Sequence, residues 1–460
     1  MAGVQVLLEV PAERENSLEM FGAATTSSAE AERQASDFLS GIGGLGIEFD
    51  DGFAPVPMYA AEDTPPGPGE FLEAFSPRTA VAPPTSRTFI LPAEVTRTRL
   101  DELQGTADVT VWPNSQITLL GPMRSTIEVA DSRGGVDCRP FRPAVELDVL
   151  RDLLGVDALW NSGFRGQNII VGILDEGVDG NAYPVVGGFA RPDAALQPGA
   201  ASVSSHGSMC AADVMVAAPF SRLYDYPFLG IPRSGGALQM FQAVLNQRNV
   251  DGTPHLTNNS YGFTGVPDVA SFPNHEIHNP NHPLHRKVRE VVAAGVPCFF
   301  AAGNCGQNCP SGDCHPSGIG PGISIHASNS LAEVITVAAV NSRHERIGYS
   351  SQGPGMFEQQ KPDVASYSHF FGNFGPGRPA GGTTDDFDNG TSAATPVAAG
   401  VAAALMSANP ALTPAQLKDL MINTSADVGP VVGWDPDHGH GIVNAAAAFM
   451  AMNPGPRLVS

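Results

Sequence analysis

The residue best suited to chemistry in this chain is Ser392, which follows Gly390 and Thr391 and stands shortly before a run of Ala, Val, Leu and Gly at residues 397–405. Such a run predicts a buried helix with the serine in its first turn. The N–H groups of a first turn lack partners within the helix and carry the positive end of its dipole, so they stabilise negative charge that develops beside them. Pro396 is expected early in this helix, where its missing N–H costs little. Taken alone, the stretch also fits an ordinary capped core helix.

A base, an acid and a hydrogen-bond donor that could serve such a serine occur earlier in the chain. Asp175 directly follows the apolar residues 171–174, which predict a buried parallel strand. Such a strand ends at the edge where open α/β sheets place their sites. His206 stands at a second candidate helix start, and Asn304 follows the apolar run 299–303. The order Asp, His, Ser along the chain is one of three unrelated orders in which the Asp-His-Ser triad occurs.

The blocks around these residues resemble the motifs of the subtilisin-like serine proteases (subtilases, peptidase family S8). The resemblance extends over residues of about 150 to 450 and includes further blocks at 258–262, 349–354, 361–365 and 439–445. It implies that Ser392 attacks the scissile carbonyl, that His206 is the general base and that Asp175 orients the imidazole. It also implies that Asn304 and the Ser392 N–H bind the oxyanion.

The resemblance also implies a fold, which is a doubly wound, mostly parallel α/β sheet. Strands are expected near 168–174, 256–260, 297–302 and 334–340, and helices near 206–216, 236–248, 284–294 and 392–407. Two short segments would receive the substrate strand; they are Ser260, Tyr261, Gly262 and Ala301, Ala302, Gly303. Their glycines favour an open specificity pocket with an apolar or broad preference. Tyr261 stands where many relatives have a smaller aliphatic residue and is expected to shape an outer pocket.

Several other polar residues compete for a place in this site. Asp179 lies in the same turn as Asp175 and could take its role. Glu176 stands where many relatives have a small hydroxyl residue, and it adds negative charge close to the site. Among the remaining histidines, His255 and His315 lie in blocks expected near the site and are second-rank candidates.

Three of the six cysteines crowd into one loop that begins directly after Asn304. Three thiols and an imidazole could make a tetrahedral zinc site, and the set would be Cys305, Cys309, Cys314 and His315. The spacing is not a pair of Cys-x-x-Cys knuckles, so a disulfide or free thiols in a rigid loop are favoured. Cys298 and Cys210 are predicted to face the core. The chemistry requires no cofactor, and calcium is expected only through the resemblance, because no loop has a convincing ligand pattern.

Composition limits the classes of partner. The 460 residues leave room for two domains and a large core. With 25 Lys and Arg against 47 Asp and Glu, the net charge is −22, which repels nucleic acid and anionic membranes. No stretch approaches the ~20 apolar residues of a transmembrane helix. Residues 1–10 lack a basic leader and do not form a secretory signal, so a cytoplasmic location is predicted, with secretion by another route left open.

Residues 1–125 are predicted to form a separate, small α+β domain. Strands are expected at 4–10, 46–53, 87–92, 109–112 and 116–119, and helices at 29–39 and 96–104. This order approximates the ferredoxin-like β-α-β-β-α-β unit, interrupted by a Pro-rich loop at 60–86. Residues 126–150 would be a linker or processing region, followed by a catalytic domain at 151–452.

The N-terminal domain resembles the family's propeptide, an intramolecular chaperone and inhibitor whose C-terminal tail runs through the active-site cleft. The segment from Leu119 to Arg124 is the candidate tail, and processing is expected somewhere in 120–145. Pro122 argues against a cleaved bond directly beside it, because proline lacks a pairing N–H. The alternative is a permanent accessory domain that is never cleaved.

The predicted function is a serine endopeptidase that acts on a peptide or protein substrate and is made as a zymogen, with its own N-terminal domain as inhibitor. Two alternatives stay open. The chain could be a narrowly specific or partner-activated processing protease, or it could be a catalytically silent binding module on the same fold.

Overall fold

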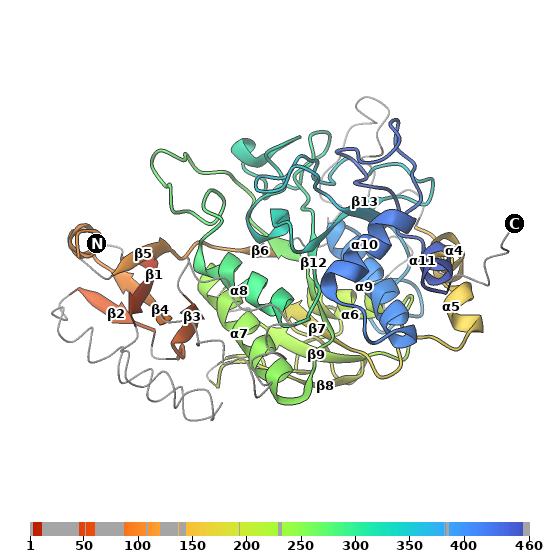
Figure 1. Cartoon of the computed structure of the whole chain (residues 1–460), viewed down its shortest axis with the longest axis horizontal. Helices are drawn as coiled ribbons and strands as arrows, with labels where there is room; N and C mark the ends of the chain where they lie inside the picture. The colour runs from red at the N-terminus through yellow and green to blue at the C-terminus, as the bar shows by residue number, and fades with distance from the viewer. Residues whose placement is uncertain are drawn as a thin grey trace, which may run out of the picture.

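The computed structural model of the chain contains a large and a small β-sheet that lie side by side (Figure 1). It describes residues 3–11, 46–50, 52–59, 87–106, 109–119, 137, 144–192, 194–228, 232–380, 382 and 386–453. The predicted helix at 29–39, the Pro-rich loop at 60–86, the tail residues 120–124 and most of the predicted linker lie outside these residues.

The large sheet has seven parallel strands in the order β14-β13-β12-β10-β7-β9-β8. The strands are β7 (Ile170–Asp175), β8 (Val185–Gly188), β9 (Arg222–Pro227), β10 (Leu256–Asn259), β12 (Cys298–Ala301), β13 (Ile335–Val340) and β14 (Val364–Tyr367). From β7 the chain first adds strands on one side and then crosses to β10 on the other. The carboxyl ends of β7 and β10 therefore flank the switch point, where doubly wound sheets bind ligands. The predicted fold and its four predicted strands are confirmed.

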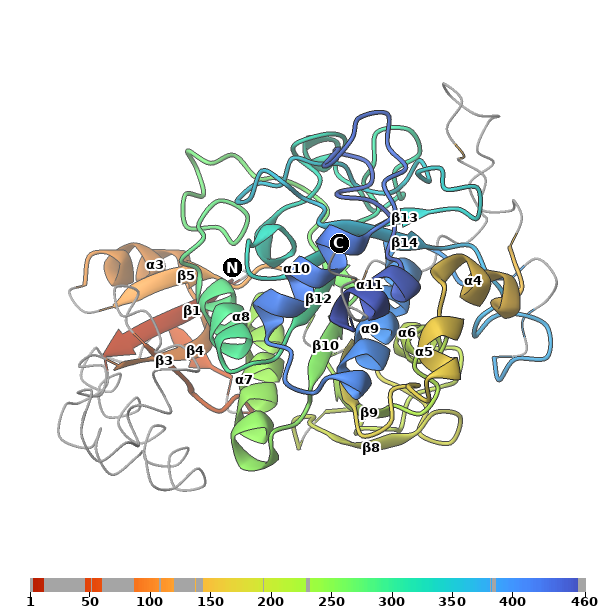
Figure 2. The ribbon, with the colours of Figure 1, turned by 45° about the vertical axis from the view of Figure 1, so that its right-hand side comes forward.

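Helices cover both faces of this sheet (Figure 2). On one face lie α6 (His206–Val214), α9 (Thr391–Ala408) and α11 (Ala445–Met452), and on the other lie α7 (Ser234–Asp251) and α8 (Pro283–Ala293). Because strand side chains alternate, Ile173 and Phe299 belong to the first core, and Leu174 and Phe300 belong to the second. The remaining helices are α3 (Arg97–Gln104), α4 (Leu147–Leu154), α5 (Asp157–Asn161) and α10 (Pro414–Thr424). The four predicted helices are confirmed.

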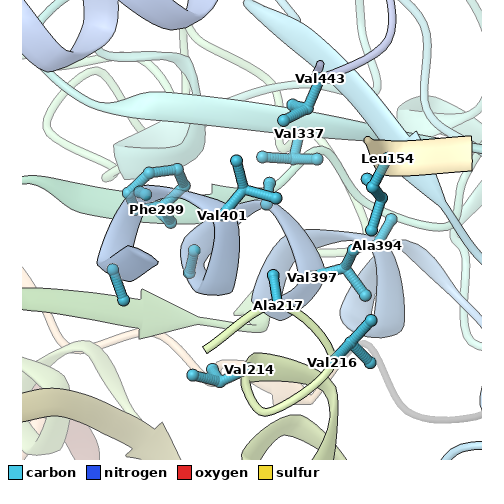
Figure 3. Close-up of a cluster of buried hydrophobic side chains, with 14 of the residues drawn as sticks. Leu154, Val214, Val216, Ala217, Phe299, Val337, Ala394, Val397, Val401 and Val443 are labelled. Atoms are coloured by element: carbon cyan, nitrogen blue, oxygen red, sulfur yellow. The ribbon is translucent and has the colours of Figure 1, made fainter. Parts of the chain in front are cut away.

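The helix that begins at the candidate nucleophile, α9, lies at the centre of the first core. Figure 3 shows Val397 and Val401 of α9 among Phe299 and Val337 of the sheet and Val214 of α6. Among the described residues, α9 is the one helix long and apolar enough to cross a membrane. However, 89% of that stretch is buried inside the fold, as expected of a core helix.

The small sheet has the order β2-β4-β1-β5, with β3 also paired to β4, and every pair is antiparallel. Its strands are β1 (Val4–Pro11), β2 (Ile47–Phe49), β3 (Val56–Tyr59), β4 (Arg87–Val95) and β5 (Thr110–Pro113). This strand order is that of the predicted ferredoxin-like unit. The strand predicted at 46–53 is wrong in detail, because the chain breaks after Phe49 and pairs with β4 again as β3. The domain boundaries stay predictions, although α4 begins inside the range assigned to the linker.

The last predicted strand of this region does not join the small sheet. The strand expected at 116–119 was assigned to the small domain, but β6 (Thr118–Leu119) pairs antiparallel with β11 (Tyr261–Gly262) of the large domain. Leu119 faces Tyr261 and Thr118 faces Gly262. The N-terminal segment thus reaches the strand that the sequence assigned to substrate binding.

Candidate active site

Asp175 is the last residue of β7, and its carboxylate contacts the imidazole of His206 across the sheet edge. His206 Nδ1 lies 2.7 Å from Asp175 Oδ1, and both side chains are buried. The same oxygen accepts the Glu176 N–H at 2.6 Å. A buried carboxylate that accepts the Nδ1 proton fixes the imidazole tautomer and leaves Nε2 as the basic nitrogen.

The start of α6 holds His206 against this carboxylate. Ser205 is the N-cap: its hydroxyl accepts the Ser208 N–H at 3.1 Å and donates to Gly177 O at 2.7 Å. A Cβ at Gly207 would lie 2.4 Å from Gly177 O, so glycine is required for the helix to approach the turn this closely. Ser205 therefore connects the helix that begins at His206 to the turn that follows Asp175.

The two acidic competitors have other partners. Glu176 Oε2 accepts the His206 backbone N–H at 2.9 Å, at the positive end of α6. Asp179 accepts the Asn181 N–H at 2.8 Å, within its own turn. The geometry therefore assigns the contact with His206 to Asp175, and it gives Glu176 a role in holding the helix start.

Cys210 is a member of this cluster that the sequence reading placed only in the core. Its Sγ lies 3.6 Å from Asp175 Oδ2 and 4.0 Å from His206 Nδ1. Burial raises the pKa of the Cys210 thiol well above its ordinary value, and the Asp175 charge raises it further. The thiol is therefore an S–H donor to Asp175. The four-residue spacing places Cys210 on the same helix face as His206, but the contact with Asp175 joins two separate segments and no local pattern marks it. The three ligand atoms lie within 4.8 Å of one another, close enough for a soft metal ion, but the triad geometry accounts for the same contacts.

Ser392 is the second residue of α9 and is fully buried. Pro396 lies inside this helix rather than in its first turn, so the prediction that its missing N–H is harmless needs correction. The Ser392 carbonyl loses its usual helical partner, the N–H four residues on. Instead it accepts from Ser260 Oγ at 3.3 Å and faces the Cys210 thiol at 3.6 Å. Because of the proline, the Ser392 carbonyl is available to contact Cys210 on α6 and Ser260 after β10.

Asn304 lies directly beside the nucleophile turn. Its Oδ1 accepts two hydrogen bonds from Thr391, one from the backbone N–H and one from the hydroxyl, both at 2.9 Å. The Gly303 N–H in turn donates to Thr391 Oγ1 at 3.2 Å. Because these bonds fix the oxygen side of the amide, Nδ2 is the side that can donate to a developing oxyanion.

Comparison with known proteins decides the family. The model of the subtilase family (Peptidase S8) matches residues 166–441.

The chain belongs to the subtilase family. It is therefore a hydrolase of the subtilisin type, a serine peptidase. It is 26% identical to subtilisin of Bacillus pumilus over 316 residues, which cover 63% of this chain and 94% of that protein. It is 28% identical to subtilisin DY of Bacillus licheniformis over 311 residues, which cover 64% and 96%.

A solved structure extends the likeness in fold over nearly the whole subtilase chain. Fervidolysin from Fervidobacterium pennivorans, a keratinolytic enzyme related to subtilisin, matches with a TM-score of 0.55 at 17% identity. The match covers 99% of this chain, which spans 61% of fervidolysin's length.

The two predicted substrate walls lie at the ends of β10 and β12. Ser260, Tyr261 and Gly262 follow β10, whereas Ala301 is the last residue of β12 and Ala302 and Gly303 follow it. Asn329, which the sequence reading missed, bridges the walls: its Nδ2 donates to Tyr261 O at 2.9 Å and to Ala301 O at 2.7 Å. No local motif marks this contact, because it joins three distant segments.

The Tyr261 side chain does not shape an outer pocket, so that expectation is wrong. Its ring is 2% exposed and packs edge-on against Phe228 and Phe300 in the second core. Only the backbone of Tyr261 faces the pairing strand. A smaller aliphatic residue at this position would leave a void between these two rings.

The two second-rank histidines take structural roles. His255 Nδ1 accepts the Ile170 N–H at 3.0 Å, at the opposite end of β7 from Asp175. His315 Nδ1 accepts the Ser317 N–H at 3.2 Å and caps a single 3-10 turn. Neither contacts the residues of the triad.

The cysteine loop is closed by disulfide bonds. Cys305 is bonded to Cys314, and Cys309 is also disulfide-bonded. The three cysteines of the zinc candidate are therefore disulfide-bonded and do not offer thiolate ligands, which agrees with the prediction that favoured a disulfide in this loop. The cytoplasmic location stays a prediction, and these bonds weigh against it because disulfides persist mainly in oxidising compartments.

The nucleophile turn of this subtilase rests on a buried tyrosine. Tyr349 Oη accepts the Gly390 N–H at 2.9 Å and lies 3.1 Å from both Ser368 Oγ and His369 Nε2. Ser368 Oγ donates to Gly390 O at 3.0 Å. Gly390 has a φ of 83°, so these bonds hold the backbone in the conformation that starts α9.

Replacing Tyr349 by phenylalanine is expected to lower kcat about tenfold with little change in KM. The substitution leaves the buried Gly390 N–H without its acceptor, which costs about 1–3 kcal/mol and loosens the turn before Ser392. Steady-state kinetics on a short chromogenic peptide measure the effect. The matched control is Tyr367→Phe, another buried tyrosine, which should change kcat by less than twofold. Equal losses in both variants would contradict the role given to Tyr349.

Proposed function

We propose that this subtilase is a serine endopeptidase in which Asp175, His206 and Ser392 form the triad. The observation that carries the proposal is the 2.7 Å contact between His206 Nδ1 and Asp175 Oδ1, at the start of a helix that is linked to the nucleophile turn. Because Nδ1 is held by the carboxylate, Nε2 is the nitrogen that can take a proton from Ser392.

The reaction follows from these positions. Ser392 Oγ attacks the scissile carbonyl while His206 takes its proton, and the Asp175 carboxylate stabilises the resulting imidazolium. Asn304 Nδ2 and the Ser392 N–H bind the oxyanion. His206 then gives the proton to the leaving amine, which leaves an acyl-enzyme on Ser392. A water molecule repeats the sequence and releases the acid.

The N-terminal domain is proposed to inhibit this site before activation. Its last described strand, β6, pairs with β11 as an antiparallel strand, which is how a substrate strand would bind at this wall. Two ion pairs also hold the domain: Arg286 contacts both Glu9 oxygens at 2.8 and 3.0 Å, and Arg191 binds Asp50 through two bonds of 2.8 Å. Trp112 Nε1 also donates to Glu9 at 2.8 Å, so this carboxylate is well matched.

The register narrows the expected processing position. Leu119 faces Tyr261, so the next position of an antiparallel strand would face Ser260. Ser260 Oγ donates to the Ser392 carbonyl, which brings that position to the nucleophile. Within the range 120–145, we therefore expect cleavage one residue after Leu119, at the Leu120–Gly121 bond, because the next bond lies beside Pro122.

Expression of the full chain beside its Ser392→Ala variant tests the proposal. The wild type should react with a serine-directed fluorophosphonate and shorten with time, and intact mass should place the new terminus within a few residues of Leu119. The Ser392→Ala chain should do neither. A folded wild type that neither labels nor shortens would contradict the endopeptidase, whereas labelling without shortening would contradict only the zymogen.

A further inference from the structure

The segment between the small sheet and β6 makes polar contacts with the protease along its length. Ile117 N–H donates to Pro232 O at 2.6 Å, and Ser234 N–H donates to Ser115 O at 3.0 Å. Gln116 and Arg233 form an antiparallel bridge. These contacts continue the pairing at β11 backward along the bound strand, with the start of α7 on one side and residues 275–282 on the other.

Ser115 is bound there by a buried carboxylate. Its N–H donates to Glu276 Oε1 at 3.0 Å, and its hydroxyl donates to Glu276 Oε2 at 2.7 Å. His275 Nδ1 accepts the Ile277 N–H at 3.2 Å, so its Nε2 carries the proton and donates to Ser115 Oγ at 3.0 Å. Every polar group of Ser115 except its carbonyl is therefore matched by these two side chains.

Glu276 is fully buried and ionised, so it can only accept hydrogen bonds. Burial alone would raise the pKa of Glu276, but His282 and His275 bring it below its ordinary value. An acceptor of this kind selects a peptide residue that offers both a backbone N–H and a hydroxyl.

Asn114 occupies the neighbouring position. Its Oδ1 accepts the Gly235 N–H at 2.9 Å, and the Arg233 guanidinium donates to its backbone oxygen at 3.0 Å. The residue at the N-cap of α7, Arg233, makes no capping bond with its own side chain. The side chain of the bound segment therefore supplies the cap that α7 lacks.

We propose that four residues of the protease recognise protein substrates in the way that they bind the chain's own Asn114 and Ser115. These residues, here called the Asn-Ser socket, are Arg233, Gly235, His275 and Glu276. This inference rests on the proposed function. Suppose that a substrate strand pairs with β11 in the register of β6. Its residue opposite Gly262 then corresponds to Thr118, and the residue three positions earlier corresponds to Ser115 and lies opposite Glu276. The preferred substrates then carry a Ser or Thr there, preceded by Asn or another amide side chain.

The physical reason is that departure of the tail leaves these groups without their partners. These groups then face water, and a peptide that offers the same backbone N–H, hydroxyl and amide oxygen replaces that water with matched bonds, including bonds to a charged carboxylate. The socket lies several residues from the scissile bond, so its contribution adds to the recognition made near Ser392 and does not depend on the residue before the cleaved bond.

The test uses the full-length protein after self-processing, with rates divided by the number of fluorophosphonate-labelled sites. Three quenched fluorescent peptides are compared: residues 112–126 of this chain, the same peptide with N114A and S115A, and a peptide that begins at residue 116. The parent peptide should have a kcat/KM about 100-fold above that of the double variant, because two matched bonds are lost. The shortened peptide should be cleaved no faster than the double variant, because it also lacks the backbone bonds of residues 114 and 115 to Glu276, Ser234 and Arg233.

Protease variants localise the effect. With Glu276→Gln the advantage of the parent peptide over the double variant should fall about tenfold, and the number of fluorophosphonate-labelled sites measures how much of the variant is folded. Glu333→Gln, a surface carboxylate paired with Arg289, should keep the full advantage. Equal kcat/KM values for all three peptides would overturn the inference and leave the endopeptidase standing. If no peptide is cleaved and no site labels, the proposed function fails and the inference fails with it.

Discussion

Replacing Asp175 by alanine is expected to lower kcat about 10⁴-fold, the size of the effect known for the corresponding triad acid of subtilisin. The carboxylate holds His206 Nδ1 at 2.7 Å, so its loss frees the ring to rotate and removes the charge that stabilises the imidazolium. Steady-state kinetics normalised to active sites measure the loss. Asp179→Ala is the matched control, since Asp179 bonds within its own turn, and it should retain nearly full activity.

An Asp175→Asn variant separates charge from orientation. Asp175 Oδ1 accepts both His206 and the Glu176 N–H, whereas Oδ2 faces Cys210. The amide oxygen is therefore expected on the His206 side and the amide nitrogen beside sulfur, which preserves the tautomer. The asparagine variant should consequently be at least tenfold more active than the alanine variant. If the two variants are equally impaired, the assignment of the two oxygens is wrong.

Replacing Asn304 by alanine removes the Nδ2 donor and is expected to lower kcat by about 10²–10³-fold, with KM changed less than threefold. The expected loss in kcat is the range found for the corresponding asparagine of subtilisin. The amide Nδ2 contacts charge that exists only in the transition state, so its loss leaves binding of the ground state nearly intact. Fluorophosphonate labelling should slow as well, because that reaction also develops charge on oxygen.

Two variants at Asn304 distinguish the oxyanion from simple packing. Asn304→Asp keeps an oxygen for both Thr391 donors, at 2.9 Å each, but replaces the donor by negative charge. Asn304→Ala loses both functions. If the donor is what matters, the aspartate variant should be at least as impaired as alanine while its thermal stability stays closer to that of the wild type. Asn409→Asp at the end of α9 is the control. A fully active Asn304→Asp variant would exclude this residue from the oxyanion site.

Residues that stand next to a strong local signal could be predicted from the sequence. Asp175 ends an apolar strand, and His206 and Ser392 begin helices, so each position follows from short-range patterns. The parallel strands and core helices followed for the same reason, because burial on both faces leaves apolar runs. The antiparallel order of the small sheet was also predicted, although β3 was missed because the chain interrupts its edge strand.

Residues whose role depends on distant neighbours could not be found in this way. Cys210 was predicted to be a core residue, yet its sulfur contacts the triad acid. Tyr261 was expected at an outer pocket, yet Phe228 and Phe300 enclose its ring. Pro396 looked harmless, yet it opens the Ser392 carbonyl to Ser260. In each case the partner lies more than thirty residues away or on another element, beyond the reach of periodicity.

The sequence by itself determined the family, placed a serine at the start of a buried helix, and supplied a candidate base and candidate acids, because these depend on residue type and local spacing. Only the tertiary structure decided which carboxylate meets His206, that β6 leaves its own sheet for β11, and that Ser115 meets Glu276. Such contacts form when segments far apart in the chain pack together, and their geometry is set by the sheet and the helices rather than by neighbouring residues.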